Sequence, residues 1–127
     1  MAIAAFVVID LCVMCVVITA FVAPVRELGK QFPPTPPAAG AVRRNFQSFR
    51  FGVLNAGSAI HVAVDDRRLH LSPSWLMRLM RMPAMSIPWA NVRLIHRGKR
   101  ATRVRIESER ERMEVKGPTW CLELASA

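Results

Sequence analysis

Residues 3–23 of the chain read IAAFVVIDLCVMCVVITAFVA, an apolar stretch that divides the sequence into two parts. Only Asp10 and Thr19 interrupt it, and as a helix its 21 residues would extend about 31 Å, which matches the hydrocarbon core of a bilayer. A cleaved signal peptide would carry a basic residue before the apolar run. None precedes it here, and Pro24 follows the only small-residue cleavage site. The stretch therefore predicts an uncleaved transmembrane helix.

The charges that flank this stretch predict its orientation. No Lys or Arg precedes it, whereas Arg26, Lys30, Arg43 and Arg44 follow it closely. Because the basic flank of a span stays in the cytoplasm, we expect the N-terminus outside and the C-terminal domain in the cytoplasm. The helix should continue past the span through residue 31 and end before Pro33, since proline disfavours the helical conformation of the residue before it.

The span itself carries one ionisable side chain and one stripe of small side chains. Asp10 would cost about 2.5–3.5 kcal/mol near the bilayer centre, so it either contacts another helix, reaches toward water or stays protonated. Cys12, Cys15, Thr19 and Ala23 share one helix face, where small side chains permit close helix packing. We interpret the two cysteines as packing residues, because no further metal ligand is near them. The candidate contacts within the membrane are Asp10, Cys12, Cys15 and Thr19.

The rest of the chain is predicted to form a short linker and a β domain. Residues 32–41 contain Pro33, Pro34, Pro36 and Pro37, which are typical of a stiff extended spacer. Residues 42–127 alternate apolar and polar side chains, which indicates half-buried strands. The pattern predicts strands near 49–53, 60–64, 69–71, 92–94, 104–106 and 113–115, turns at 55–57, 65–66 and 97–100, a basic helical segment at 75–81, and a last strand or turn at Leu122 and Leu124.

The β domain is strongly basic. The chain has 18 Lys and Arg against 9 Asp and Glu, a formal net charge of +9, and residues 67–106 hold ten basic residues and no acidic one. Such a segment attracts polyanions. The candidate residues for contact with anionic lipid headgroups or with a membrane protein are Trp75, Arg78 and Arg81 in the helical segment, and Arg97, Lys99 and Arg100 in the turn.

The sequence contains no recognisable catalytic or cofactor motif. His61, His70 and His96 lie in different predicted strands without Cys, Asp or Glu at ligand spacing, which argues against a metal site. A glycine-rich phosphate loop and a nucleophile elbow are absent, and three cysteines are too few for a disulfide framework. We therefore expect no catalytic residue, no metal, no cofactor and no small-molecule substrate. Nucleic acid is not expected either, because no known reader motif is present.

Three features together resemble a known family: the span followed by Phe32 and Pro33, the stretch RLHLS at 68–72, and the stretch MSIPWANV at 85–92. They are typical of small bacterial proteins with one N-terminal span and a pleckstrin-homology-like domain related to GRAM domains. The resemblance implies an α+β chain in the inner membrane, with a transmembrane helix before a small, mainly antiparallel partial β-barrel. Its most specific part is a structural motif, Ile87, Pro88 and Trp89. Pro88 should end a strand because it lacks a ladder donor, and Trp89 should supply apolar surface to the core.

Two functions remain open at this point, besides the simpler interpretation that the arginines only solvate a small β domain next to an acidic membrane. The first is a non-enzymatic, membrane-anchored module whose cytoplasmic domain docks on anionic lipid headgroups. The alternative is an accessory subunit or adaptor of a larger inner-membrane complex, which would use Asp10, the small side chains of the span and the apolar residues of 75–85 as contacts. Members of the resembling family are mostly without an assigned function, so the resemblance does not choose between the two.

Overall fold

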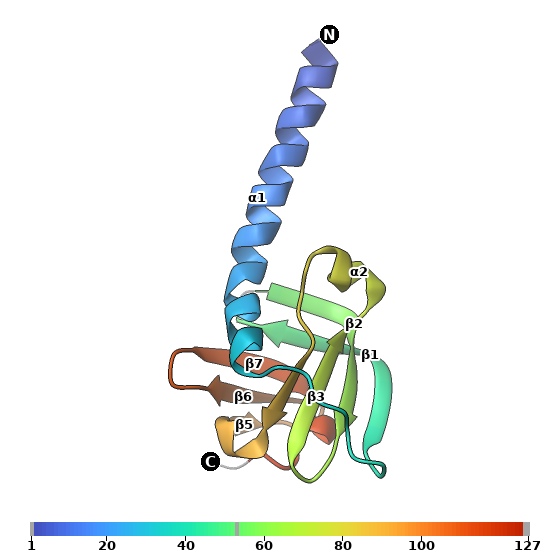
Figure 1. Ribbon diagram of the computed structural model, residues 1–127, viewed down its shortest axis with the longest axis vertical. Helices are drawn as coiled ribbons and strands as arrows, with labels where there is room; N and C mark the ends of the chain where they lie inside the picture. The colour runs from blue at the N-terminus through green and yellow to red at the C-terminus, as the bar shows by residue number, and fades with distance from the viewer. Residues whose placement is uncertain (1, 53, 126–127) are drawn as a thin grey trace.

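The computed structural model describes residues 2–52 and 54–125. In these residues a long helix, α1, is followed by seven antiparallel strands that form one curled sheet, a half-barrel around a hydrophobic core (Figure 1). The predicted α+β architecture, a helix followed by a mainly antiparallel β domain, is confirmed at this level. The elements are α1 (Ala2–Gln31), β1 (Val42–Phe51), β2 (Leu54–Val64), β3 (Arg68–Pro73), α2 (Trp75–Leu79), β4 (Met85–Pro88), the 3-10 helix η1 (Trp89–Asn91), β5 (Val92–Arg97), β6 (Ala101–Glu107), β7 (Arg112–Pro118) and the 3-10 helix η2 (Thr119–Cys121).

Two antiparallel meanders make the sheet. β1 to β4 form the first and β5 to β7 the second, so the strand order is β4-β3-β2-β1-β7-β6-β5. β1 joins the two through β7, with Arg50 opposite Lys116 and Phe51 opposite Val115. β1 starts at Val42, earlier than predicted. The alternation pattern missed its first residues because two register shifts interrupt the alternation there. Alternate residues of the strands enter the core, among them Phe49, Ile60, Leu69, Ile87, Val104 and Val115.

The first reversal of the sheet lies earlier in the chain than predicted. Residues 55–57, predicted as a turn, are inside β2, and β1 ends just before Gly52, whose φ of 60° glycine adopts without strain. Val53, predicted in a strand, lies outside the described residues. The turns at 65–66 and 97–100 and the helical segment α2 are found where the sequence predicts them. Leu122 and Leu124 follow η2 in a turn rather than a strand.

α1 has two different environments along its length. It is uninterrupted through residue 31, as predicted, and it is long and apolar enough to cross a membrane. Between residues 2 and 20 its side chains are exposed apart from the half-buried Ile18. By contrast Val22, Val25 and Leu28 are buried, and Val25, Leu28 and Phe32 belong to the core cluster of the β domain. The last turns of α1 are therefore a structural part of the domain.

The proline-rich segment, residues 32–41, contains no strand and no helix, as expected for an extended spacer, but hydrogen bonds hold it on the sheet, which was not predicted. The N–H of Thr35 donates to Ser86 Oγ at 2.8 Å, and the N–H of Ser86 donates to the carbonyl of Phe32 at 3.2 Å. The N–H of Ala38 donates to Asp65 Oδ2 at 3.1 Å. The prolines have no N–H to donate, so the N–H groups of Thr35 and Ala38 make the contacts from this segment. The prediction did not include these contacts, because proline spacing alone does not reveal partners that are distant in sequence.

The close approach of α1 to the segment after α2 depends on Gly29. A Cβ at this position would lie 2.5 Å from Cγ of Pro83, in a rigid ring. Alanine favours a helix by about 1 kcal/mol over glycine, but we expect Gly29→Ala to lower the free energy of unfolding by a net 1–2 kcal/mol, roughly the cost of overpacking a core. Chemical unfolding of the full chain in detergent measures this. Gly40→Ala, where a Cβ would meet nothing within 4 Å, is the control, and an equal change in both variants would contradict the prediction.

Candidate functional site

The end of the domain from which α1 projects carries a short helix with an exposed apolar surface. α2 lies at this end (Figure 1). The segment that follows α2 packs on α1, where the ring of Pro83 lies against Gly29. Three apolar side chains of α2 are exposed: Trp75 by 70%, Leu76 by 54% and Leu79 by 72%. An exposed apolar group of this kind is a candidate for contact with lipid or with another protein.

A capping motif holds α2 on the domain. The N–H of Met82 donates to the carbonyl of Met77 at 3.1 Å, and the N–H of Arg81 donates to that of Arg78 at 2.9 Å, while both methionines are buried. This is a Schellman cap, which usually places glycine where Arg81 stands. Arg81 has a φ of 60°, a conformation that costs a non-glycine residue about 1–2 kcal/mol. A strained and exposed arginine is a reason to assign its side chain a role.

The second predicted basic group lies elsewhere. Arg97 donates to two carbonyl oxygens of the C-terminal segment, at 3.1 and 3.3 Å, and the N–H of Thr119 in η2 donates to the carbonyl of Arg100. Lys99 is exposed in the same turn. In Figure 1, η2 (red) lies at the end of the domain opposite α2. The structure therefore places Trp75 and Arg78 on α2 and Arg81 in the cap that follows it, and keeps the turn at residues 97–100 apart from them.

The predicted intramembrane residues are all on the exposed part of α1. Thr19 Oγ1 donates to the carbonyl of Cys15 at 2.7 Å, so its hydroxyl is satisfied within its own helix. Asp10, Cys12 and Cys15 are exposed. Their contact with a second helix stays a prediction.

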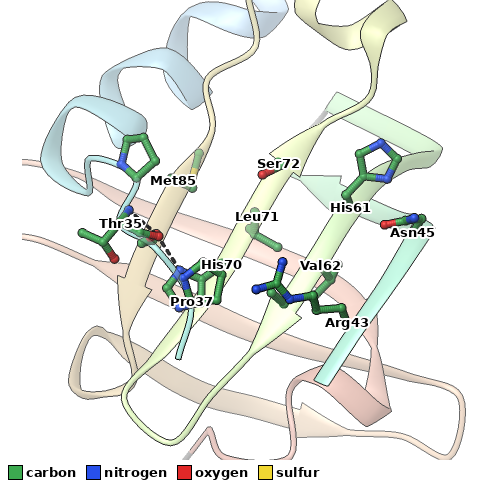
Figure 2. A pocket seen from close by; sticks show the side chains of 13 residues that line it. Thr35, Pro37, Arg43, Asn45, His61, Val62, His70, Leu71, Ser72 and Met85 are labelled. Atoms are coloured by element: carbon green, nitrogen blue, oxygen red, sulfur yellow. Dashed lines mark hydrogen bonds between the residues drawn. The ribbon is translucent and has the colours of Figure 1, made fainter. Parts of the chain in front are cut away.

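A buried series of hydrogen bonds, which sequence reasoning missed, lies on the outer face of the sheet, and Figure 2 shows the part of it between His70 and the proline-rich segment. Nε2 of His70 is 2.8 Å from Asp65 Oδ2, and its Nδ1 is 2.7 Å from Ser86 Oγ. His70 and Ser86 are buried and directly opposite each other on β3 and β4, while Asp65 begins the turn before β3. The available signal was an aspartate in a tight turn, five residues before a histidine of the next strand.

Hydrogen bonds determine the protonation state of the Asp65 carboxyl. Burial alone would raise the pKa of the Asp65 carboxyl, but hydrogen bonds outweigh it and hold the pKa well below its usual value. The donors are His70 and the N–H groups of Arg68 at 2.7 Å, Ala38 at 3.1 Å and Arg67 at 2.9 Å. Asp65 is therefore ionised at neutral pH, and Nε2 of His70 carries the proton that it donates to the carboxylate.

Ser86 connects these hydrogen bonds to the proline-rich segment. Its Oγ accepts the N–H of Thr35, and Arg68 donates to Thr35 Oγ1 at 2.9 Å. Serine, histidine and aspartate also make catalytic triads. Here, however, Ser86 is only 4% exposed and its oxygen is already engaged by both His70 and Thr35. The arrangement fits a lock that holds the segment on the sheet, and we name these residues, Thr35, Asp65, His70 and Ser86, the linker lock.

A shallow pocket of about 210 Å³ lies beside the linker lock, between the proline-rich segment and the outer face of β1 and β2 (Figure 2). Arg43, Asn45 and His61 are among the residues that line it. Nδ1 of His61 accepts the N–H of Phe46 at 3.3 Å. Among the described residues, no three His, Cys, Asp or Glu side chains are grouped so that they could hold a metal ion.

The motif at residues 87–89 adjoins the same turn. Ile87 is fully buried, Pro88 is the last residue of β4, and Trp89 begins η1 in a half-buried position against the core. Nε1 of Trp89 donates to the carbonyl of Asp65 at 2.9 Å. The motif thus contributes to the core and also fixes the turn that supplies the linker lock.

Comparison of the chain with models of known protein families, with curated proteins and with solved structures gives no match. The resemblance to pleckstrin-homology-like proteins therefore stays a prediction.

The linker lock predicts a pH-dependent loss on removal of Asp65. Because the folded pKa is depressed, the carboxylate stabilises the fold above the unfolded pKa of about 3.9, and this contribution is lost as the pH falls through the folded pKa. Asp65→Asn should lower the free energy of unfolding at pH 7 by about 3 kcal/mol. The difference from wild type should narrow below about pH 4.

Denaturant unfolding of the full chain in detergent, at pH 7 and at pH 3, measures both effects. The neighbouring Asp66 is exposed, so Asp66→Asn is a matched control that should change stability by less than about 0.5 kcal/mol. A difference between Asp65→Asn and wild type that does not depend on pH would contradict the assignment.

Proposed function

We propose that the protein is a non-enzymatic, single-span membrane protein whose β domain docks on anionic lipid headgroups through α2. The observation that carries this proposal is that two apolar surfaces occupy the same end of the domain: the exposed residues 2–20 of α1 and the exposed side chains of α2 (Figure 1). The curled seven-stranded sheet agrees with a pleckstrin-homology-like half-barrel, and we include this family relation in the proposal.

The length of the exposed helix sets the height of the domain at the membrane. Residues 2–20 cover about 28 Å, close to the thickness of a hydrocarbon core of about 30 Å. Burial against the domain begins directly afterwards, at Val22. Since Val25 and Leu28 fix α1 in the core, the domain does not swing freely below the span. α2 would then lie at the level where lipid headgroups begin.

The composition of α2 suits this level. Tryptophan is enriched at membrane interfaces, and burial of an apolar side chain such as Leu76 or Leu79 contributes about 1.5–3 kcal/mol. Arg78 and Arg81 would each contribute about 1 kcal/mol near an anionic surface. Because α1 already holds the domain at the membrane, these small contributions suffice to fix its orientation.

The flanking charges support one orientation for this arrangement. Arg26, Lys30, Arg43 and Arg44 follow the exposed part of α1, and the positive-inside rule then places the N-terminus outside and the domain in the cytoplasm. In a bacterium, a membrane protein whose domain faces the cytoplasm lies in the inner membrane. α2 would meet the cytoplasmic leaflet, whose anionic lipids give it a negative surface potential.

One observation favours the alternative, an accessory subunit or adaptor of an inner-membrane complex. Asp10 is exposed on α1, and no described residue pairs with it. An ionisable group within a bilayer usually faces another helix or a water-filled cavity. In that case the apolar side chains of α2 would cover a protein partner instead of lipid.

Tryptophan quenching distinguishes these functions. The full chain is reconstituted in vesicles whose lipids carry bromine near the carbonyl end of the acyl chain, with or without anionic lipid. The fluorescence that the bromine quenches in wild type but not in Trp75→Phe comes from Trp75. Because Trp75 is exposed, the variant should fold. We expect quenching of about half of the Trp75 emission in anionic vesicles, because the indole lies at the interface. The quenching should weaken in high salt.

Charge variants complete this experiment. Arg78→Gln and Arg81→Gln should each reduce the quenching in anionic vesicles and leave it unchanged in neutral ones. Arg67→Gln is the matched control, because Arg67 is exposed in the turn between β2 and β3, at the other end of the domain. If Trp75 is not quenched in either kind of vesicle, α2 does not reach lipid, and the subunit hypothesis is favoured.

A further inference from the structure

The outer face of the second meander carries a row of basic side chains that sequence reasoning did not assemble. Arg50 of β1 is paired with Lys116 of β7, Lys116 with Arg103 of β6, and Arg103 with His96 of β5. Directly paired residues in an antiparallel sheet point to the same face. All four side chains are exposed. With strands about 4.8 Å apart, the row extends about 14 Å across the sheet.

The face opposite this row is the core. Phe51, Val104 and Val115, which alternate with the basic residues, are almost completely buried. Like charges on neighbouring strands destabilise a sheet, so the row is not explained by stability. The fold therefore presents the cations Arg50, Arg103 and Lys116 to solvent as a set, with His96 at the end of the row.

Few carboxylates neutralise the row. Arg103 forms an ion pair with Glu114 at 3.3 Å. Within the described part of the chain, Arg50 and Lys116 form no ion pair, and Arg50 uses only its Nε, which donates to the carbonyl of Gly52 at 3.2 Å. The terminal nitrogens of its guanidinium group remain free to bind a ligand.

The row also has a hollow surface. Arg50, Arg103, Glu114 and Lys116 line a shallow depression on this face. A second depression continues from Arg50 and Lys116 to Arg100, in the turn between β5 and β6. Arg50 and Lys116 thus lie at the centre, with Arg103 and Arg100 on either side.

We propose that this cationic face, Arg50, Arg100, Arg103 and Lys116, binds a ligand that carries two or more phosphate groups. Arginine matches phosphate with two parallel hydrogen bonds, and a single phosphate would leave most of the row unpaired. Among the residues that line the two depressions the one aromatic side chain, Phe49, is buried, so none is free to stack on the bases of a single-stranded nucleic acid. The phosphates belong either to a soluble ligand or to a phosphorylated lipid headgroup. The site is separate from α2 and does not depend on the docking proposed above.

Titration of the full chain with tripolyphosphate tests this inference. The chain is held in nanodiscs of neutral lipid at low salt, and binding is measured by calorimetry. Arg50→Gln and Lys116→Gln should each weaken binding about fivefold and reduce its salt dependence, whereas Arg67→Gln should change it less than about twofold. All three residues are exposed, so the variants should fold, and circular dichroism checks this.

A gain of binding separates a defined site from general positive charge. Glu114→Gln removes the carboxylate of the depression and should strengthen tripolyphosphate binding about twofold or more. Glu109→Gln causes the same change of net charge in the exposed connection between β6 and β7, and should have no such effect. Equal effects of the two variants, or equal losses in Arg50→Gln and Arg67→Gln, would overturn the proposal.

A last arm identifies the source of the phosphates. The titration is repeated in nanodiscs that contain a phospholipid whose headgroup carries an additional phosphate group. If the lipid competes with tripolyphosphate and Lys116→Gln removes the competition, the site takes headgroup phosphates. Unchanged binding indicates a soluble ligand. Either result supports the phosphate site, and an absence of tripolyphosphate binding in neutral nanodiscs would overturn it.

Discussion

The packing of the last turns of α1 into the half-barrel is the contact on which the rest of the structure depends. Val25, Leu28 and Phe32 complete a core that the strands alone would leave open at one end. A β domain of this size buries only a modest core, so the helix is a large contribution to its stability. The same helix carries the exposed apolar residues 2–20. The anchor and the domain are therefore one structural unit.

The linker lock makes this unit rigid and leaves different chemistry on different surfaces. A proline-rich segment alone would let the domain move, but the ionised Asp65, through His70 and Ser86, holds it on the outer face of β3 and β4. The end beside α1 is apolar and carries Arg78 on α2 and Arg81 in its cap. The outer face of β5 to β7 stays uncovered in the described structure and is cationic. In our proposals the first surface meets lipid and the second binds phosphates.

Sequence pattern predicted what depends on local periodicity. The length of α1, the approximate positions of most strands and the helical segment of α2 follow from apolar spacing, and Pro33 marks the helix end. Contacts between distant residues could not be predicted this way. Asp65, His70 and Ser86 come together only through the register of β3 and β4, and Arg50 joins Lys116 only through the β1–β7 pair. For the same reason the sequence grouped the arginines of α2 with the turn at 97–100, which the fold separates.

Labelling of the native cysteines measures most directly whether α1 lies in a bilayer. Cys12 and Cys15 are in the exposed part of α1, whereas Cys121 is buried, and burial raises the pKa of its thiol to about 12, so it gives little background. In vesicles that contain the folded full chain, a charged, water-soluble maleimide should label neither Cys12 nor Cys15, and unfolding in detergent should expose all three thiols. Rapid labelling of Cys12 and Cys15 in the vesicles would show that residues 2–20 are in water and would contradict the account.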